Sequence, residues 1–337
     1  MAADGALPRR LAYSVALSAA VAVVVGMITP LIGSTSLSYS RAFAGQSPDF
    51  EILFYARVPR VLLSLIAGGG LAVAGVLFQA VLRDALATPF TLGISAGASL
   101  GAVIAISAGT GTIAAVPATW VGAALGAFTT LLIVLAVATE GRRMSSFTLL
   151  LTGTTVNSIS MAGILFLQNL STFGQSFAIV RWLMGGIEAV NYSTLAWLGS
   201  LVVAASCVLF FKAREWNVLA VGEEWAEARG VSTSRLLLTG YLAGSLIAGS
   251  VTALTGPIGF VGLIVPHALR LRLGADHRVL LPCAFFLGAA FLAICDVVAR
   301  TLLAPSEIPV GVITAMLGGP FFIYLLRSRR KAAVSGG

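Results

Sequence analysis

Ten long runs of apolar residues occupy most of this 337-residue chain and constrain its fold more than any other feature. They lie near residues 11–33, 61–82, 90–108, 116–138, 147–167, 190–211, 236–255, 258–273, 279–299 and 310–326. Each run is compatible with crossing a hydrocarbon layer of roughly 30 Å, although a few are short. Because lipid offers no partners for backbone N–H and C=O groups, such runs must be helical. The sequence therefore predicts an all-α polytopic membrane protein with about ten transmembrane helices in a single domain, residues 1–337.

The composition agrees with a membrane location. Hydrophobic residues make up 58% of the chain and charged residues 10%, whereas soluble domains carry about 25% charged residues. The first run, residues 11–33, follows Arg9 and Arg10 and could be a cleaved signal. It is long for one, however, and no A-x-A cleavage site follows it directly, so we expect a retained helix.

Basic residues are distributed unevenly between the two sides that the ten runs define. With the N-terminus in the cytoplasm, 16 of the 21 Lys and Arg residues fall on the cytoplasmic side. These are Arg9, Arg10, Arg83, Arg142, Arg143, Lys212, Arg214, Arg229, Arg235, Arg270, Arg272, Arg278, Arg327, Arg329, Arg330 and Lys331. The positive-inside rule then predicts that both termini are cytoplasmic. Membrane topology accounts for the net charge of +8, so we expect no nucleic-acid partner.

Residues 212–235 form the longest charged segment and, with this topology, lie in the cytoplasm. Eight of the 34 charged residues fall within these 24 positions. Glu223 and Glu224 would begin a short helix, and Arg229 with Gly230 would end it. About two turns of helix are unstable alone in water, so the helix must dock on something. The segment is either a solvated loop or a contact element that presents Val221, Trp225 and Ala228 to another protein.

Few residues in this chain have the chemistry of an enzyme. Its two lysines, Lys212 and Lys331, do not follow glycine, so the chain lacks the Gly-Lys of an ATP-binding P-loop. The two histidines, His267 and His277, have no metal-site spacing, so we expect no metal site and no catalytic residues. Asp296 is the main acidic residue within an apolar run and precedes Arg300 by four positions, which favours an ion pair over a proton relay.

Several long motifs resemble one family: the permease subunits of bacterial ATP-driven importers for iron-siderophores, haem and vitamin B12. The resemblance covers essentially the whole chain. It is carried by RVPRVLLSLIAGGGLAVAGVLFQAVLRDALATPFTLGISAGASLGA (57–102), WLMGG (182–186), GEEWAEARGVS (222–232), GPIGFVGLIVPHALRLRLGADHRVLLP (256–282) and DVVARTLLAPSEIPVGVITAMLGGPFFIYLL (296–326).

This resemblance implies a type II ABC importer permease fold in the bacterial inner membrane. It implies a homodimer of ten-helix subunits around a translocation pathway, lined largely by the fifth and tenth helices. Two separate ATP-binding subunits, which would hold ATP and Mg²⁺, attach on the cytoplasmic side, and a periplasmic binding protein docks on the other. Residues 212–235 match the coupling helices that contact the ATPase subunits. The residues we expect there are Glu223, Glu224, Trp225, Ala228, Arg229 and Gly230.

Five arginines, Arg41, Arg57, Arg60, Arg181 and Arg300, would face the periplasmic side. In the family, arginines of the R-x-P-R motif and near the end of the ninth helix accept acidic residues of the binding protein. Here these are Arg57, Arg60 and Arg300. A charge pair at such a rim supplies register and association rate. The alternative is that these arginines anchor the protein at the lipid headgroups.

The turn after the second helix departs from the family pattern. Where relatives have Arg-Asn-Pro-Leu, this chain reads Arg83-Asp84-Ala85-Leu86. The resemblance places Asp84 and Leu86 at a cytoplasmic gate, with Ser145 and Ser146 as its counterpart at the start of the fifth helix. Asp84 would alter gate closure or repel anionic cargo; alternatively, it forms a salt bridge with Arg83 or another basic neighbour.

The most specific prediction concerns the cargo. The pathway candidates carry few charges, which suits a large, mostly apolar chelate that passes without tight binding. Haem, ferric siderophore and cobalamin all fit, and the run of motifs looks most like haem permeases. We therefore expect haem, with a siderophore or vitamin B12 as the alternative and an ion-coupled secondary transporter as a distant one.

Overall fold

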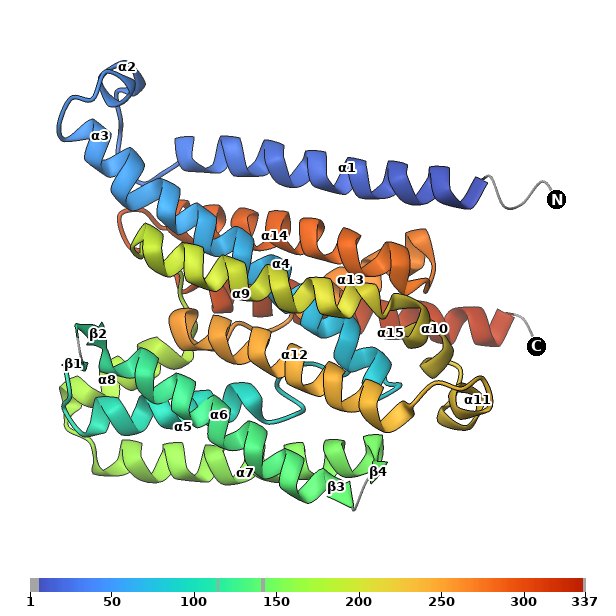
Figure 1. Ribbon diagram of the computed structural model, residues 1–337. Coiled ribbons are helices and arrows are strands. Elements are labelled where there is room, and N and C mark those ends of the chain that lie inside the picture. The colour runs from blue at the N-terminus through green and yellow to red at the C-terminus, as the bar shows by residue number, and fades with distance from the viewer. Residues whose placement is uncertain (1–5, 114, 141–142, 336–337) are drawn as a thin grey trace.

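A computed structural model describes residues 6–113, 115–140 and 143–335, and it is almost entirely helical (Figure 1). Each of the ten predicted apolar runs contains a helix. These are α1 (Ala6–Ile28), α4 (Val58–Val81), α5 (Ile94–Ser107), α6 (Ala118–Ala138), α7 (Ser146–Leu170), α9 (Tyr192–Phe211), α12 (Thr233–Thr255), α13 (Val261–Leu273), α14 (His277–Thr301) and α15 (Val310–Ser335).

Seven helices in the described part of the chain are long and apolar enough to cross a membrane. The other three, α5, α13 and the apolar part of α15, are shorter. At 1.5 Å per residue, the 13 residues of α13 reach only about 20 Å, so α13 alone cannot cross the roughly 30 Å of hydrocarbon. The prediction of an all-α polytopic membrane protein is confirmed.

Helix α4 lies at the centre of the molecule, and its glycines allow neighbours to approach closely. An added Cβ on Gly68 would overlap the carbonyl oxygen of Gly288 in α14, and one on Gly75 would overlap that of Gly262 in α13. Such contacts require glycine because the backbones themselves touch. The run of glycines in the sequence therefore fixes α4 as the helix against which α13 and α14 pack.

Pairs of glycines four residues apart also meet neighbouring helices. Gly97 and Gly101 of α5 lie against Gly126 and Gly122 of α6, and an added Cβ at any of the four would overlap a facing carbonyl. Gly240 and Gly244 of α12 instead receive the rings of Trp216 and Phe78. The same four-residue spacing therefore admits a facing backbone in one place and aromatic rings in another.

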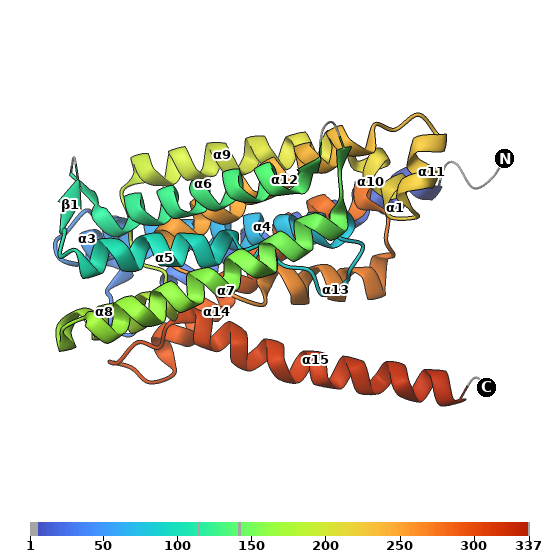
Figure 2. The same ribbon diagram turned by 90° about the horizontal axis from the view of Figure 1, so that it is seen from below.

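Short elements join the helices at two opposite ends of the bundle (Figures 1 and 2). One end, which we call the α11 end, holds α10 (Ala213–Leu219), α11 (Glu223–Ala228), the hairpin of β3 (Thr139–Glu140) and β4 (Arg143–Met144), and the chain ends of α1 and α15. The opposite end holds α2 (Tyr39–Phe43), α3 (Asp49–Glu51), α8 (Phe173–Leu183) and the hairpin of β1 (Thr112–Ile113) and β2 (Val116–Pro117). A 3-10 turn, η1 (Thr29–Leu31), follows α1.

The chain departs from the sequence prediction at two places. Helix α4 continues backward through a π-helical stretch, η2 (Ile52–Arg57), into α3, which makes one 33-residue span from Asp49. Arg57 and Arg60 therefore sit inside a helix and not before one. Helix α8 was not predicted, although Thr172 and Gln175 form a capping box whose T-x-x-Q pattern marks a helix start.

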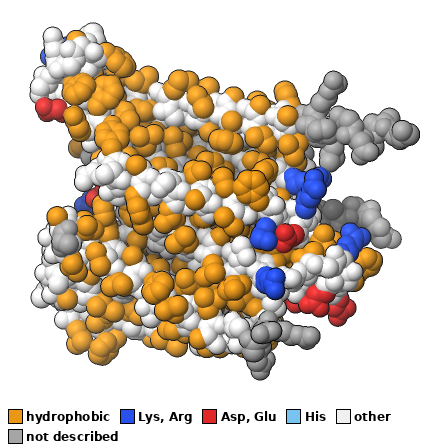
Figure 3. Space-filling view, in the orientation of Figure 1, with side chains coloured by type: hydrophobic (Ala, Val, Ile, Leu, Met, Phe, Trp, Pro, Cys, Tyr) orange, Lys and Arg blue, Asp and Glu red, His pale blue; other side chains and the backbone are white. Residues whose placement is uncertain are grey.

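Charged side chains visible in Figure 3 gather mainly around α10 and α11, with a few at the opposite end, and apolar side chains cover much of the face between them. This placement follows the predicted concentration of basic residues on one side. Arg142 of the predicted set lies outside the described residues, and so do the side chains of Arg9, Arg10, Arg143, Arg327, Arg329, Arg330 and Lys331.

Candidate functional site

The charged segment 212–235 folds as predicted around a short helix. Glu223 and Glu224 occupy the first turn of α11, Arg229 is its C-terminal cap, and Gly230 adopts a positive φ of 78°. Glycine suits this left-handed position because it has no Cβ. Negative charge at the start complements the helix dipole, so the local sequence by itself accounts for where α11 begins and ends.

The outer face of α11 combines exposed apolar side chains with charge. Val221 is 71% exposed and Trp225 59% exposed, and Ala228 is exposed on the same helix. The guanidinium of Arg229 lies 5.7 Å from the Trp225 ring centroid, within the range of a cation–π contact. Ala226 faces inward and is fully buried. An exposed tryptophan ringed by charge is typical of a surface that another protein covers.

Glu223 points the other way and joins α11 to two distant segments. Its Oε1 accepts a hydrogen bond from Arg83 Nη2 at 3.1 Å, in the turn after α4, and one from Ser146 Oγ at 2.9 Å, at the start of α7. Ser145 caps α7 by accepting from the backbone N–H of Thr148. The structure thus brings both predicted gate segments to the predicted coupling helix through one carboxylate.

Asp84 forms a local turn. Its Oδ1 accepts the backbone N–H of Leu86 at 2.9 Å, and both residues are exposed. Among the described residues, the Arg83 guanidinium pairs with Glu223, so the alternative of an Asp84–Arg83 salt bridge is not what the structure shows.

Asn217, which the sequence analysis did not single out, fixes α10 to the start of α14. Its amide donates to Asp276 Oδ1 at 2.8 Å, and its carbonyl oxygen accepts the backbone N–H of His277 at 2.8 Å. Hydrogen bonds from Arg278 and Asn217 outweigh partial burial and lower the pKa of Asp276 to about 2. Asp276 stays ionised at neutral pH and caps α14; the Asp at an N-cap position was the available sequence signal.

At the opposite end, Asp296 lies at the centre of a buried cluster. Its Oδ1 accepts from Arg60 Nε at 3.0 Å and Arg60 Nη2 at 2.9 Å, and its Oδ2 lies 3.7 Å from Arg300 Nε. Arg60 Nη1 also reaches Glu307 at 2.8 Å. The expected structural ion pair of Asp296 is confirmed, but Arg60 is its principal partner and not Arg300.

Arg57 and Arg300 are only 6% and 3% exposed. Arg57 Nη2 donates to the carbonyl of Thr35 at 2.5 Å, and Arg300 Nη2 donates to that of Thr29 at 2.8 Å. Both guanidiniums are therefore covered in this single subunit and bind its own backbone, and the docking of a partner on these two arginines stays a prediction. Of the three predicted docking arginines, Arg60 comes nearest the surface, with its side chain 16% exposed.

Helix α7 exposes polar groups halfway along a candidate span. Thr154, Thr155, Asn157 and Ser158 are all exposed. The three hydroxyls donate to carbonyls of the preceding turn, whereas an amide such as that of Asn157 is costly to place against lipid. This face of α7 is therefore suited to water or protein contact.

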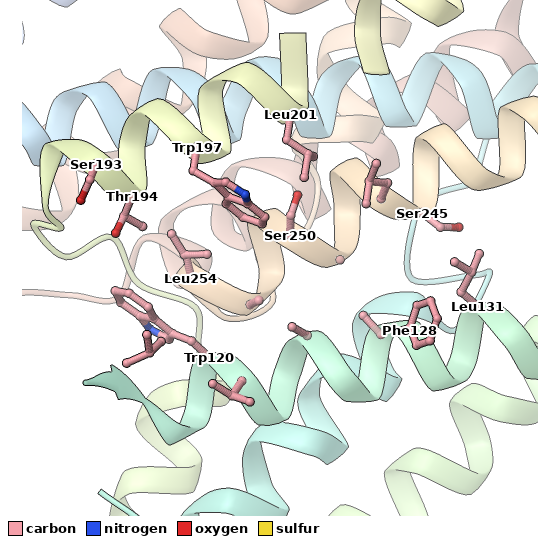
Figure 4. Close-up of a pocket in the computed structure, with 17 residues that line it drawn as sticks. Trp120, Phe128, Leu131, Ser193, Thr194, Trp197, Leu201, Ser245, Ser250 and Leu254 are labelled. Carbon is pink, nitrogen blue, oxygen red and sulfur yellow. The ribbon is translucent and has the colours of Figure 1, made fainter. Parts of the chain in front are cut away.

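An apolar groove of about 570 Å³ lies between α6, α9 and α12 (Figure 4). Trp120 and Trp197 lie toward one end of it with Ser193 and Thr194, and Phe128 and Leu131 lie toward the other. Neither α7 nor α15 contributes to its lining, and the lining side chains carry no charge. The groove thus lies apart from the helices expected to line the pathway.

No group of three or more His, Cys, Asp or Glu residues that could hold a metal ion occurs in the described part of the chain. Ion pairs form in two separate places, Arg83 with Glu223 beside α11 and Arg60 with Asp296 at the opposite end, and such pairs provide positioning and recognition.

Comparison with known proteins decides the family. The FecCD transport family matches residues 18–328. The chain belongs to this family.

Relatives of this FecCD protein cover nearly all of it. The hemin transport system permease protein HmuU of Yersinia pestis is 36% identical over 313 residues, 92% of this chain and 93% of that protein. The cobalamin import system permease protein BtuC of Halobacterium salinarum is 41% identical over 282 residues, 82% of this chain and 74% of that protein.

A solved structure described as an inward-facing conformation of a metal-chelate type ABC transporter is also similar, with a TM-score of 0.80 and 31% identity. The match covers 94% of this chain and 99% of that one. The FecCD protein is therefore the membrane-embedded permease of an ABC importer of the metal-chelate, haem and vitamin B12 class.

Proposed function

We propose that this permease carries haem from the periplasm to the cytoplasm across a bacterial inner membrane. It works as a homodimer, with two ATP-binding subunits at the α11 end and a periplasmic binding protein at the opposite end. ATP and Mg²⁺ bind at the partner subunits, because this chain has no Gly-Lys with which to form a P-loop.

The observation that carries the proposal is the exposed face of α11. Trp225, Val221 and Arg229 form a compact patch that is both apolar and charged, and Ala226 holds the helix to the bundle from behind. Hot spots at protein interfaces are enriched in Trp and Arg. This patch lies at the same end of the molecule as both chain ends (Figure 1), in keeping with one cytoplasmic side.

The polar face of α7 supports a second copy around a pathway. Asn157 and its neighbours would meet hydrocarbon in an isolated subunit, and a polar face within a span is expected to turn toward protein or a water-filled cavity. Pairing two copies through this side of the molecule removes that cost and creates a passage that neither copy forms alone.

The Arg60 cluster supports docking of a binding protein, with Arg60 as the contact in place of all three predicted arginines. Arg60 is the arginine that an acidic partner could reach, since Glu307, which it also binds, lies on the exposed loop between α14 and α15. Arg57 and Arg300 instead hold this end together from inside. An acid of the binding protein would compete with Glu307 for Arg60.

Haem is the proposed cargo because the hemin permease relative combines 36% identity with a match over 92% of this chain. The cobalamin relative matches 82% of the chain, and the ferric enterobactin permease FepD of Escherichia coli matches 92% at a lower identity of 32%. The higher identity of the cobalamin relative keeps vitamin B12 as the alternative, with a ferric siderophore beside it. Each is a large, mostly apolar chelate, consistent with few charges on the candidate pathway helices.

Reconstitution tests both levels of the proposal. The permease is co-purified with its ATPase subunits, placed in liposomes and supplied with the binding protein loaded with haem or with cyanocobalamin. We expect uptake that requires both ATP and binding protein, with haem favoured and followed by its absorbance. Uptake of cyanocobalamin alone would reassign the cargo.

An ion-coupled secondary transporter is the competing class, and the same liposomes distinguish it. If uptake followed an imposed ion gradient and ignored nucleotide and binding protein, the importer proposal would be wrong.

A further inference from the structure

One oxygen atom of Glu223 connects three segments that are far apart in the sequence. Glu223 Oε1 receives Arg83 Nη2 from 140 residues away and Ser146 Oγ from 77 residues away. Arg83 belongs to the turn that ends α4, and Ser146 begins α7. Three backbone segments at the α11 end therefore share a single acceptor.

The other two acids of α11 make no such connection in the described structure. Glu227 Oε1 accepts from Thr233 Oγ1 at 2.7 Å, which closes the short loop to α12, and Glu224 points to solvent. The helix thus presents Trp225 outward and Glu223 inward, so the surface and the internal contact are on different residues and can be varied separately.

The backbone at Arg83 gives independent support. Arg83 has a φ of 51°, in the left-handed region, directly after the C-terminal cap of α4. Glycine is the usual residue at this position, because a side chain there is strained. An arginine at a position that favours glycine is consistent with a requirement for its side chain, and the partner of that side chain is Glu223.

The exposure of the contact suits a joint that opens and closes. The Arg83 and Glu223 side chains are 43% and 31% exposed, whereas Ser146 is buried. Ion pairs that solvent reaches are weak and exchange readily with water. The carboxylate can therefore release and recapture Arg83 while its bond to Ser146 stays shielded.

We propose that Glu223 is a positioning residue that makes the turn after α4 and the start of α7 move together with α11. When a partner displaces α11, both segments are drawn with it, so one displacement acts on the two sides of the predicted gate at once. This inference rests on the proposed role of α11 as the contact with the ATPase subunits.

The test measures cargo molecules taken up per ATP hydrolysed in liposomes, with whichever of haem or cyanocobalamin the wild-type complex transports. Loss of hydrogen bonds to a charged group should lower this ratio about tenfold in Glu223→Ala, while co-purification of the ATPase subunits persists. Arg83→Gly, which removes the donor and suits the backbone, should act in the same direction. Exchange of the two charges, Glu223→Arg with Arg83→Glu, should restore part of the ratio.

Glu215→Ala is the matched control. Glu215 lies in the same segment and carries the same charge, but it pairs locally with Lys212 at 3.2 Å. The number of cargo molecules taken up per ATP in Glu215→Ala should therefore equal that of wild type. If the Glu223→Ala permease does not reach the membrane, the same ratio is measured in Glu223→Gln. Glutamine keeps an oxygen that accepts from Ser146 and removes only the charge, so a lowered ratio there supports the inference.

The outcomes separate the inference from the proposed function. An unchanged ratio in the Glu223 variants, in a wild-type complex that couples normally, would overturn the inference alone. Failure of wild-type permease to bind ATPase subunits would remove the proposed function instead.

Discussion

The two ends of this permease both hold arginine–carboxylate clusters, yet the clusters differ in burial and in what surrounds them. Near Asp296, which is fully buried, three arginines donate hydrogen bonds: Arg60 to the Asp296 carboxylate, and Arg57 and Arg300 to backbone carbonyls. Around Glu223, the ion pair is reached by solvent and the partners come from a turn and a helix start. A buried ion pair is costly to break once formed, whereas an exposed one exchanges with water. We therefore expect the Asp296 cluster to stabilise the fold and the Glu223 junction to act as a movable joint.

The largest expected effect breaks the buried cluster. Asp296→Ala leaves Arg60 and Arg300 in the interior without their shared carboxylate, and this should lower the free energy of unfolding by about 3–5 kcal/mol. Thermal unfolding in detergent measures the loss. Glu307→Ala is the control, since its 46% exposed side chain should contribute about 1 kcal/mol or less. Equal losses in the two variants would mean that burial does not distinguish the pairs.

A second change tests the fixed part of the α11 end. Asn217→Ala removes the hydrogen bonds that join α10 to Asp276 and His277. The Asp276 carboxylate and the His277 backbone N–H each lose one hydrogen-bond partner. The expected loss is about 1–3 kcal/mol, measured in the same way. A loss of under about 0.5 kcal/mol would show that α10 is held by its apolar contacts alone.

The third compares glycine and alanine at position 83. Both substitutions remove the exposed pair with Glu223, but only glycine relieves the positive φ. Arg83→Gly should therefore be more stable than Arg83→Ala by about 1 kcal/mol and close to wild type overall. If alanine were the more stable of the two, the left-handed backbone at this turn would not persist in solution.

The fourth change should leave stability almost untouched while abolishing uptake. Glu224→Arg with Trp225→Ala alters exposed side chains, for which the free energy of unfolding should change by about 0.5 kcal/mol or less. Membrane assembly should be normal and ATP-driven uptake should fail. Survival of uptake would mean that α11 does not transmit the work of the ATPase.

The smallest expected effect concerns Asp84→Asn. The asparagine oxygen can still accept the N–H of Leu86, so we expect stability within about 0.5 kcal/mol of wild type. Transport and its pH dependence are the measurements that matter. If neither changes, the hypothesis that this carboxylate alters the gate is lost.

Much of the architecture was predictable because the forces behind it are local or periodic. The apolar runs gave the helices, and the acids and glycine of residues 222–230 gave the limits of α11. Helix α8 was missed because its 11 residues are too few to form a spanning run, although its capping box could have revealed it.

The roles of individual charged residues were harder to predict. Arg57, Arg60 and Arg300 look alike in the sequence, but two are buried against carbonyls and one connects Asp296 to the exposed Glu307. Burial depends on how α1, α4 and α14 pack together, and no local pattern records it.

The sequence by itself determined that this is a helical membrane protein, which ends carry its charge, and where its short charged helix lies, because hydropathy, capping and composition act over a few residues. Only the tertiary structure decided that Glu223 meets Arg83 and Ser146, and that Asp296 holds Arg60. Those contacts join residues 77 to 236 positions apart, and such pairs form only when helix packing fixes the distance between them.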